Sequence, residues 1–272
     1  MGKIVLGCIL IVIIGFYSCN ENETTSEPGK LTFSFSHLIN NQPIIYDAMQ
    51  YTNATGNEYE ISEIQWFISD ITLINENGIE FLLDQGGFAH YVDTDIPDSR
   101  KWDLPDEIQP GNYTSIKMTF GIKGEKNIPY SFPNSPESDM QWPYNLGGDN
   151  GGYHYMKLNG FWINTLQERT PFNFHIGVGQ EYDNDENVTG FIQNWFEMEL
   201  PNSSFTMVPG STQHMELIMN VENWFQNPHT YDHNVYGGKI MKDQEAMGKI
   251  RDNGQDVFSI KKLASVDGEN GL

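Results

Sequence analysis

The residues best suited to chemistry are concentrated in residues 140–162, which read MQWPYNLGGDNGGYHYMKLNGFW. This segment brings Trp142, a glycine-rich turn and a strand-like stretch with His154 close together in sequence. Glycine lets the backbone bend sharply, and binding residues tend to lie on loops that a rigid frame holds. We therefore expect the segment to be either part of a binding site or a strand entry with packed aromatic side chains.

Three further histidines lie in stretches with the period-two pattern of strands. His37 ends LTFSFSH on the face of the apolar residues, where it fits either the core edge or a buried site. In FNFHIGVG, His175 lies opposite the phenylalanines and either binds a ligand or faces solvent, and His214 lies opposite the apolar face of residues 213–221. Imidazole is a good ligand for copper, whereas carboxylate-rich sites favour harder ions.

Cysteine usage limits the chemistry further. The only cysteines are Cys8 and Cys19, both near the N-terminus, so the rest of the chain has no disulfide, thiolate nucleophile or cysteine-based metal site. No spacing indicates a nucleophile elbow, a phosphate loop or a pair of catalytic carboxylates. We therefore expect a protein that is not an enzyme.

The elements that must position these residues are predicted to be strands. Apolar and polar residues alternate over residues 31–37, 58–83, 113–122, 191–200 and 213–221, with Asn77-Gly78 as a hairpin turn. Prolines and glycines interrupt residues 123–152, and residues 238–254 have helical spacing. The expected fold is all-β, an antiparallel β-sandwich with long loops and a short C-terminal helix.

The N-terminus predicts export and a lipid anchor. An apolar run after Lys3 ends in FYSC, which resembles a bacterial lipobox with Cys19 as the lipidated residue. We divide the chain into a signal peptide (1–18), a lipidated acidic tether (19–30), one domain (31–262) and a C-terminal tail (263–272). This predicts an outer-membrane lipoprotein, periplasmic or surface-exposed, held to the membrane through Cys19. A formal net charge of −22 argues against nucleic acid as a partner.

A set of motifs in a fixed order then resembles a known family. They are FSFSH at 33–37, WFISDITL at 66–73, PGNY at 110–113, MQW at 140–142, GY at 152–153, MKLNG at 156–160 and FHIG at 174–177. In this order they are similar to the MbnP-like copper-binding proteins, β-sandwich domains that occur beside dihaem peroxidase-like enzymes and, in Bacteroidetes-type bacteria, often as lipoproteins. The resemblance covers residues 31–260.

The resemblance implies a copper site built from histidines, with a nearby tryptophan that some members oxidise to kynurenine. By position, His37 and His175 match the family's histidines, Trp142 matches the tryptophan, and His214 is a reserve candidate. The chain departs from the pattern at Tyr144, at residues 149–151 and at His154, which is an added candidate ligand. The resemblance also implies a dihaem peroxidase-like enzyme as a partner.

Two functions remain open from the sequence, besides a weaker third one, a hydrolase, which His154 within hydrogen-bond reach of an acid and a serine would support. The first is copper binding, in copper acquisition or handling. The second is a surface β-sandwich module that binds glycan or protein without metal, which the many aromatic residues favour. An exposed platform of Trp102, Trp142 and Trp224 would support the second function.

Overall fold

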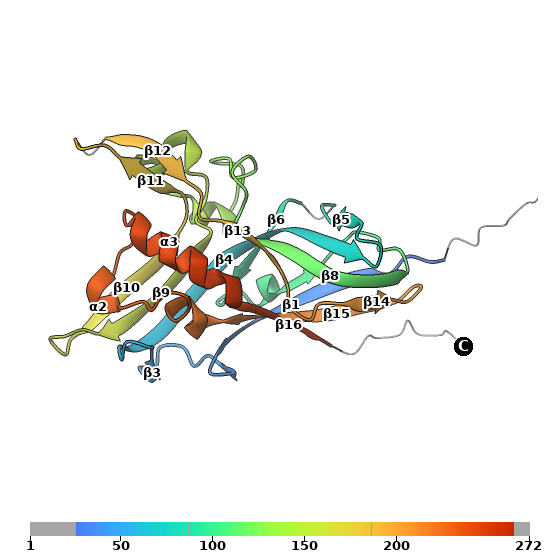
Figure 1. Ribbon diagram of the computed structural model, residues 1–272, viewed down its shortest axis with the longest axis horizontal. Helices are drawn as coiled ribbons and strands as arrows, with labels where there is room; N and C mark the ends of the chain where they lie inside the picture. The colour runs from blue at the N-terminus through green and yellow to red at the C-terminus, as the bar shows by residue number, and fades with distance from the viewer. Residues whose placement is uncertain (1–25, 86, 186, 264–272) are drawn as a thin grey trace, which may run out of the picture.

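The computed structural model describes residues 26–85, 87–185 and 187–263 (Figure 1). The predicted signal peptide, Cys19, the first part of the tether and the tail from residue 264 lie outside this range. In the part that is described, no helix has the length and apolar character needed to cross a membrane.

Most of the described chain is organised in two sheets and a separate hairpin. The first sheet contains β16 (Phe258–Lys262), β15 (Thr212–Asn220), β1 (Lys30–Ile39), β2 (Gln42–Pro43) and β7 (Lys101–Asp103). The second contains β10 (Arg169–Ile176), β9 (Met156–Ile163), β4 (Glu58–Asn75), β8 (Gly111–Phe120), β13 (Phe196–Glu199), β14 (Phe205–Met207), β3 (Tyr51–Thr52), β5 (Glu80–Leu82) and β6 (Ala89–Asp93). The hairpin pairs β11 (Gly179–Tyr182) with β12 (Val188–Ile192).

Helices are few and short, as the sequence predicts. They are α1 (Tyr144–Gly147), α2 (His233–Tyr236), α3 (Gln244–Asn253), and the 3₁₀ turns η1 (Pro97–Arg100), η2 (Glu137–Met140), η3 (Gly148–Asn150), η4 (Val221–Phe225) and η5 (Gly254–Asp256). The Asp243 side chain caps α3 by accepting a hydrogen bond from the amide of Ala246 at 2.9 Å. The all-β sandwich with a short C-terminal helix is confirmed.

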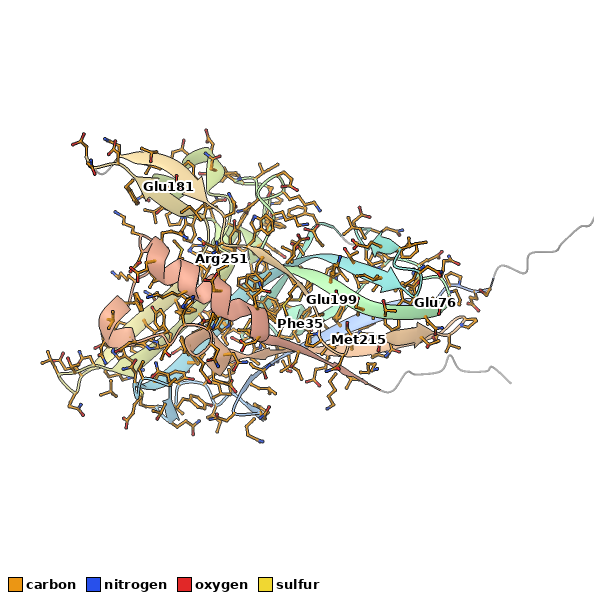
Figure 2. The ribbon with its side chains drawn as sticks, in the orientation of Figure 1. Phe35, Glu76, Glu181, Glu199, Met215 and Arg251 are labelled. Atoms are coloured by element: carbon orange, nitrogen blue, oxygen red, sulfur yellow. The ribbon has the colours of Figure 1, made fainter. Side chains whose placement is uncertain are left out.

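The pairing differs from a purely antiparallel sandwich at one place. β1 and β15 pair in parallel, whereas the other pairs between named strands in the described ranges are antiparallel. These two strands lie far apart in the sequence, and a parallel pair needs a long connection. Phe35 of β1 and Met215 of β15 are buried in the core, whereas Glu76 and Glu181 lie towards the periphery (Figure 2).

Two strand predictions had the wrong limits. The stretch 153–162 becomes a strand only at Met156, so His154 precedes β9. Residues 191–200 form the end of β12 and the separate strand β13, and between them Asn194 is fully buried and donates to the Gly177 carbonyl at 2.8 Å. At Asn194 a side-chain hydrogen bond takes the place of the regular ladder, whereas His154 and Tyr155 keep main-chain hydrogen bonds to Met140, Ile176 and Phe67 outside a named strand.

The irregular stretch 123–152 is a packed cover over the second sheet. It supplies Met140 and Phe132 to a small core with Phe67, Tyr91 and Tyr153. Phe67 neighbours Trp66 in β4, so it points to the opposite face of the sheet, away from the core between the sheets. Phe132, Met140 and Trp142 are packed as the aromatic content of this stretch leads us to expect, whereas Tyr130 and Tyr144 are exposed.

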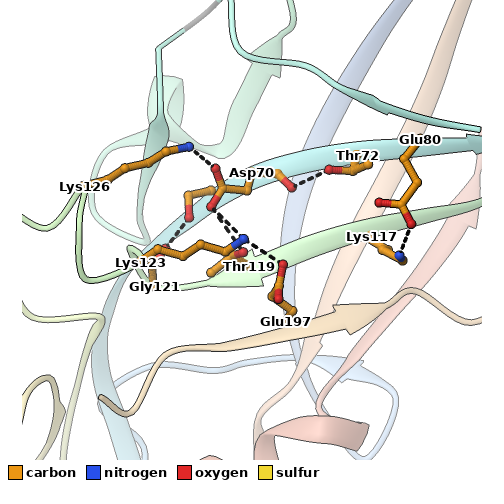
Figure 3. A network of polar contacts seen from close by, with 10 residues as sticks. Asp70, Thr72, Glu80, Lys117, Thr119, Gly121, Lys123, Lys126 and Glu197 are labelled. Atoms are coloured by element: carbon orange, nitrogen blue, oxygen red, sulfur yellow. Dashed lines mark hydrogen bonds and ion pairs between the residues drawn. The ribbon is translucent and has the colours of Figure 1, made fainter. Parts of the chain in front are cut away.

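A buried carboxylate ties the start of this cover to β4 (Figure 3). Asp70 lies at a register shift in β4 with a φ of 51° and accepts hydrogen bonds from Lys126 and, at 3.4 Å, from the Thr119 hydroxyl. Lys123 lies 3.7 Å from the same carboxylate. These contacts fix the position from which the chain enters the cover.

Candidate metal centre

Three of the predicted site residues meet beneath the cover. The ring centroids of Trp142 and His154 are 4.7 Å apart, and those of His154 and His175 are 5.1 Å apart. Trp142 follows η2, His154 immediately precedes β9 and His175 lies near the end of β10. The two imidazole rings are nearly perpendicular, at 89°.

The backbone of the cover orients His154. The carbonyl oxygen of Met140 lies 2.7 Å from the backbone nitrogen of His154 and 2.8 Å from its Nδ1. A carbonyl can only accept, so Nδ1 carries the proton and Nε2 presents its lone pair. That Nε2 atom is buried and has no hydrogen-bond partner within the described ranges.

A side chain on the neighbouring strand orients His175. Its Nε2 lies 2.8 Å from Oδ1 of Asn159, and the amide nitrogen of Asn159 donates to Glu63 at 3.1 Å. The carboxylate fixes which way the amide faces, so Asn159 accepts from His175 and the proton is on Nε2. The Nδ1 atom of His175 is then the free lone pair, and it too is buried without a partner among the residues described.

Burial keeps both imidazoles neutral at neutral pH. Burial lowers the pKa of His175 to about 4, and the positive charge of Lys157 acts in the same direction. It also lowers the pKa of His154 well below its usual value, with His175 and Lys157 as further causes. Neutral imidazoles with a lone pair that no donor occupies are the form that binds metal ions.

Trp142 completes the group and is packed against glycine. The side chain is 1% exposed, and its indole nitrogen has no partner in the described part of the chain. A Cβ atom on Gly177 would overlap the six-membered ring of the indole, and one on Gly147 would lie 2.8 Å from Cδ1. The glycines of these segments thus permit the indole to lie beside His154.

His37 lies on the other side of the second sheet. Its Nε2 accepts a hydrogen bond from the indole nitrogen of Trp66 at 3.1 Å, and burial followed by the charge of Arg100 lowers its pKa to about 3. Trp66 pairs with the buried Met156 of β9 and points towards the core between the sheets. His175 pairs with Lys157 and points to the opposite face, so the sheet separates it from His37.

His214 also lies outside the group. It is in the first sheet, where β15 pairs it with Thr32 of β1. Its side chain is half-buried, and no contact in the described ranges joins it to Trp142 or to the other histidines.

Sequence reasoning missed the residues that orient the histidines. Asn159 and Glu63 lie on the outward face of β9 and β4 and pair directly with each other. Their polar side chains alternate with buried neighbours, which could have drawn attention to them. Their link to His175 depends on strand pairing, which the sequence does not specify.

A cluster of carboxylates adjoins this network. Oxygen atoms of Glu63, Asp93 and Asp95 lie within 4.8 Å of one another. Tyr91 and Gln65 donate to Asp93, at 2.6 and 3.1 Å. Burial raises the pKa of Glu63, and the hydrogen bond from Asn159 opposes that rise.

The aromatic platform considered as an alternative does not exist. Trp102 is 7% exposed, Trp142 is 1% exposed and Trp224 is fully buried. All three belong to the hydrophobic core, where indoles contribute packing rather than a recognition surface.

Comparison with known proteins agrees with this architecture. The model of the MbnP family matches residues 28–242. The solved structure of MbnP from Methylosinus trichosporium aligns with a TM-score of 0.55 at 10% identity and covers 86% of this chain and 99% of that chain, which is a likeness of fold. No curated protein matches the sequence. The protein belongs to the MbnP family.

Proposed function

We propose that this protein binds copper at His154, His175 and Trp142 and takes part in copper acquisition or handling. One observation carries the proposal: two neighbouring imidazoles each have one nitrogen held by an acceptor and the other buried and unpartnered among the described residues. Buried polar atoms are nearly always hydrogen-bonded, so two such lone pairs on neighbouring rings favour a bound cation. Family membership favours copper.

The donor set fits copper better than a hard cation. Imidazole nitrogens suit copper and zinc, whereas calcium and magnesium prefer oxygen ligands. His154 and His175 would hold the metal, and the copper would supply a redox-active centre. The chain's own residues keep the imidazoles neutral and place them beneath the cover.

Trp142 is the candidate for oxidation. Cleavage of the indole C2–C3 bond by dioxygen, followed by hydrolytic loss of the formyl group as formate, would turn Trp142 into kynurenine, whose ring nitrogen is an aromatic amine and a further candidate ligand. The indole nitrogen of Trp142 has no competing partner among the described residues. Mass spectrometry of the peptide that contains Trp142 would detect the change, and an unmodified peptide from copper-loaded native protein would remove this part of the proposal.

The cellular setting is part of the same proposal. Lipid on Cys19 would hold the domain at the outer membrane, on its periplasmic or outer side, and a dihaem peroxidase-like enzyme would be the partner. Replacement of Cys19 by Ala should release the protein from the membrane fraction. Retention of the variant in that fraction would contradict the lipid anchor.

Metal analysis of the purified protein tests copper binding. The wild type should bind copper, and the double variant His154→Ala/His175→Ala should not. His214→Ala is the matched control, since it removes an imidazole that lies outside the group, and it should retain wild-type stoichiometry. Equal copper content in the double variant and the wild type would disprove the site.

A further inference from the structure

The two histidines of the centre are oriented by different kinds of acceptor. His154 is held by the main chain, through the Met140 carbonyl, and His175 is held by a side chain, through Asn159. The nitrogens that remain free within the described ranges are Nε2 in His154 and Nδ1 in His175. The site is therefore asymmetric before any metal binds.

We propose that Glu63 and Asn159 are positioning residues that make His175 bind metal through Nδ1, whereas His154 binds through Nε2. This inference rests on the proposed function for the identity of the metal. The protonation pattern of the two rings is a property of the metal-free protein and does not depend on which metal binds.

The first step of the argument concerns the amide of Asn159. Its nitrogen lies 3.1 Å from Oε2 of Glu63 and its oxygen 2.8 Å from Nε2 of His175. If the amide were turned over, its oxygen would face the carboxylate and its nitrogen would face the imidazole. Two acceptors would then be opposed, so Glu63 selects the observed orientation.

The second step concerns the geometry of the strands. Glu63 pairs with Asn159 between β4 and β9, and Asn159 pairs with Asn173 between β9 and β10. His175 is two residues beyond Asn173, so it points to the same face as Asn159. The three side chains thus extend across strands that the sheet holds rigidly, as outer-shell partners of metal ligands do.

The third step concerns the main-chain acceptor. The Met140 carbonyl accepts from both the backbone nitrogen and Nδ1 of His154. No change at Glu63 or Asn159 alters that acceptor directly. His154 is therefore an internal control for any variant that disturbs His175.

Nitrogen-15 NMR of the imidazole rings in the metal-free protein is the test. In the wild type at pH 7.5 we expect the proton on Nδ1 of His154 and on Nε2 of His175. Glu63→Gln removes the constraint, because a glutamine amide can face Asn159 with either end. His175 should then show both protonation patterns, while His154 is unchanged.

A double variant should restore the original protonation pattern of His175. In Glu63→Gln/Asn159→Asp, the new carboxylate can accept both from the glutamine amide at position 63 and from His175, so the proton should return to Nε2 of His175. Asn159→Leu removes the acceptor altogether. We expect copper affinity to fall by about 10–100-fold in Asn159→Leu, as is usual for loss of an outer-shell partner, and to recover in the double variant.

The outcomes separate this inference from the proposed function. A proton on Nδ1 of His175 in the wild type, or a single unchanged pattern in Glu63→Gln, would overturn the positioning role. The expected patterns in a protein that does not bind copper would support the positioning role and refute the copper proposal. If the wild type binds copper and Asn159→Leu binds it with the same affinity, the positioning role is also overturned.

Discussion

Two of the buried histidine–tryptophan pairs in the described residues, His37–Trp66 and His154–Trp142, use the same groups in different ways. In the pair His37–Trp66 the rings lie 6.3 Å apart at 87°, and the indole donates to the imidazole at 3.1 Å. In the pair His154–Trp142 the rings lie 4.7 Å apart at 63°, and the indole nitrogen and the imidazole Nε2 are both unpartnered within the described residues. The indole nitrogen and the imidazole Nε2 are hydrogen-bonded to each other in the first pair, whereas those of the second pair have no partner among the described residues. We call the first pair saturated for this reason.

The difference shows what distinguishes a structural histidine from a candidate ligand. A buried polar atom without a partner costs about 1–3 kcal/mol, so a fold normally supplies one. Trp66 supplies the partner for His37, whereas the rings of His154 and His175 lie beside each other and each keeps one buried nitrogen without a partner in the described residues. Residue type and burial are alike in the two places, and hydrogen-bond saturation separates them.

The largest expected effect is on copper affinity. His154→Ala should weaken copper binding by more than about 100-fold, because a ligand matters more than the outer-shell residues that support it. His37→Ala should leave the affinity unchanged, since its Nε2 is occupied by Trp66. Competition with a copper chelator measures both, and a loss of affinity in His37→Ala alone would reverse the comparison.

The next largest effect is on how the free energy of unfolding depends on pH. The pKa of His37 is about 3 and that of His175 about 4 in the folded chain, against 6.5 in the unfolded chain. The unfolded state therefore binds more protons below pH 6.5, and stability present above that pH is lost as pH falls towards these values. Between its folded and unfolded pKa values, each of these two histidines contributes about 1.4 kcal/mol per pH unit to the slope of the free energy of unfolding.

Urea unfolding of the metal-free protein at pH 7.5, 6 and 5 would measure this slope. His37→Gln removes one group that takes up a proton on unfolding, so it should lower the slope of the free energy of unfolding against pH by the contribution of that group. His175→Gln should do the same. If neither replacement changed the slope between pH 6 and pH 5, the pKa shifts of these two residues would be refuted.

A smaller effect compares the two tryptophans. Trp66→Phe and Trp142→Phe remove similar volume, but only the first takes a hydrogen-bond donor away from a buried acceptor. Trp66→Phe should therefore lower the free energy of unfolding by about 1–3 kcal/mol more than Trp142→Phe does. Urea unfolding at pH 7.5 gives both values, and equal losses would mean that the two pairs do not differ in saturation.

An effect of similar size concerns the packing around Trp142. Gly177→Ala should cost about 1–3 kcal/mol, because the new methyl group overlaps the indole. Gly248→Ala is the control: Gly248 lies in α3 with no neighbour nearer than 4.0 Å, and the change should stabilise the helix by about 1 kcal/mol. Thermal unfolding measures both, and a neutral Gly177→Ala would show that the indole can move away.

Much of the local structure was predictable because strand and helix patterns are local. The alternation in residues 31–37 correctly placed His37 on the inward face of β1, and that in residues 172–179 placed His175 opposite the core. The C-terminal helix followed from apolar spacing in residues 238–254, although it begins only at Gln244. Motif order also indicated the family that the comparison establishes.

The sequence by itself thus determined the fold class, the family and which strand face His37 and His175 occupy. Only the tertiary structure decided which histidines meet. His37 and His175 lie on opposite sides of the second sheet, and His154 joins His175 because the cover brings Met140 to the side of His175. Strand pairing also brings Asn159 and Glu63 to His175. These contacts join residues far apart in the chain, and periodicity constrains only neighbours.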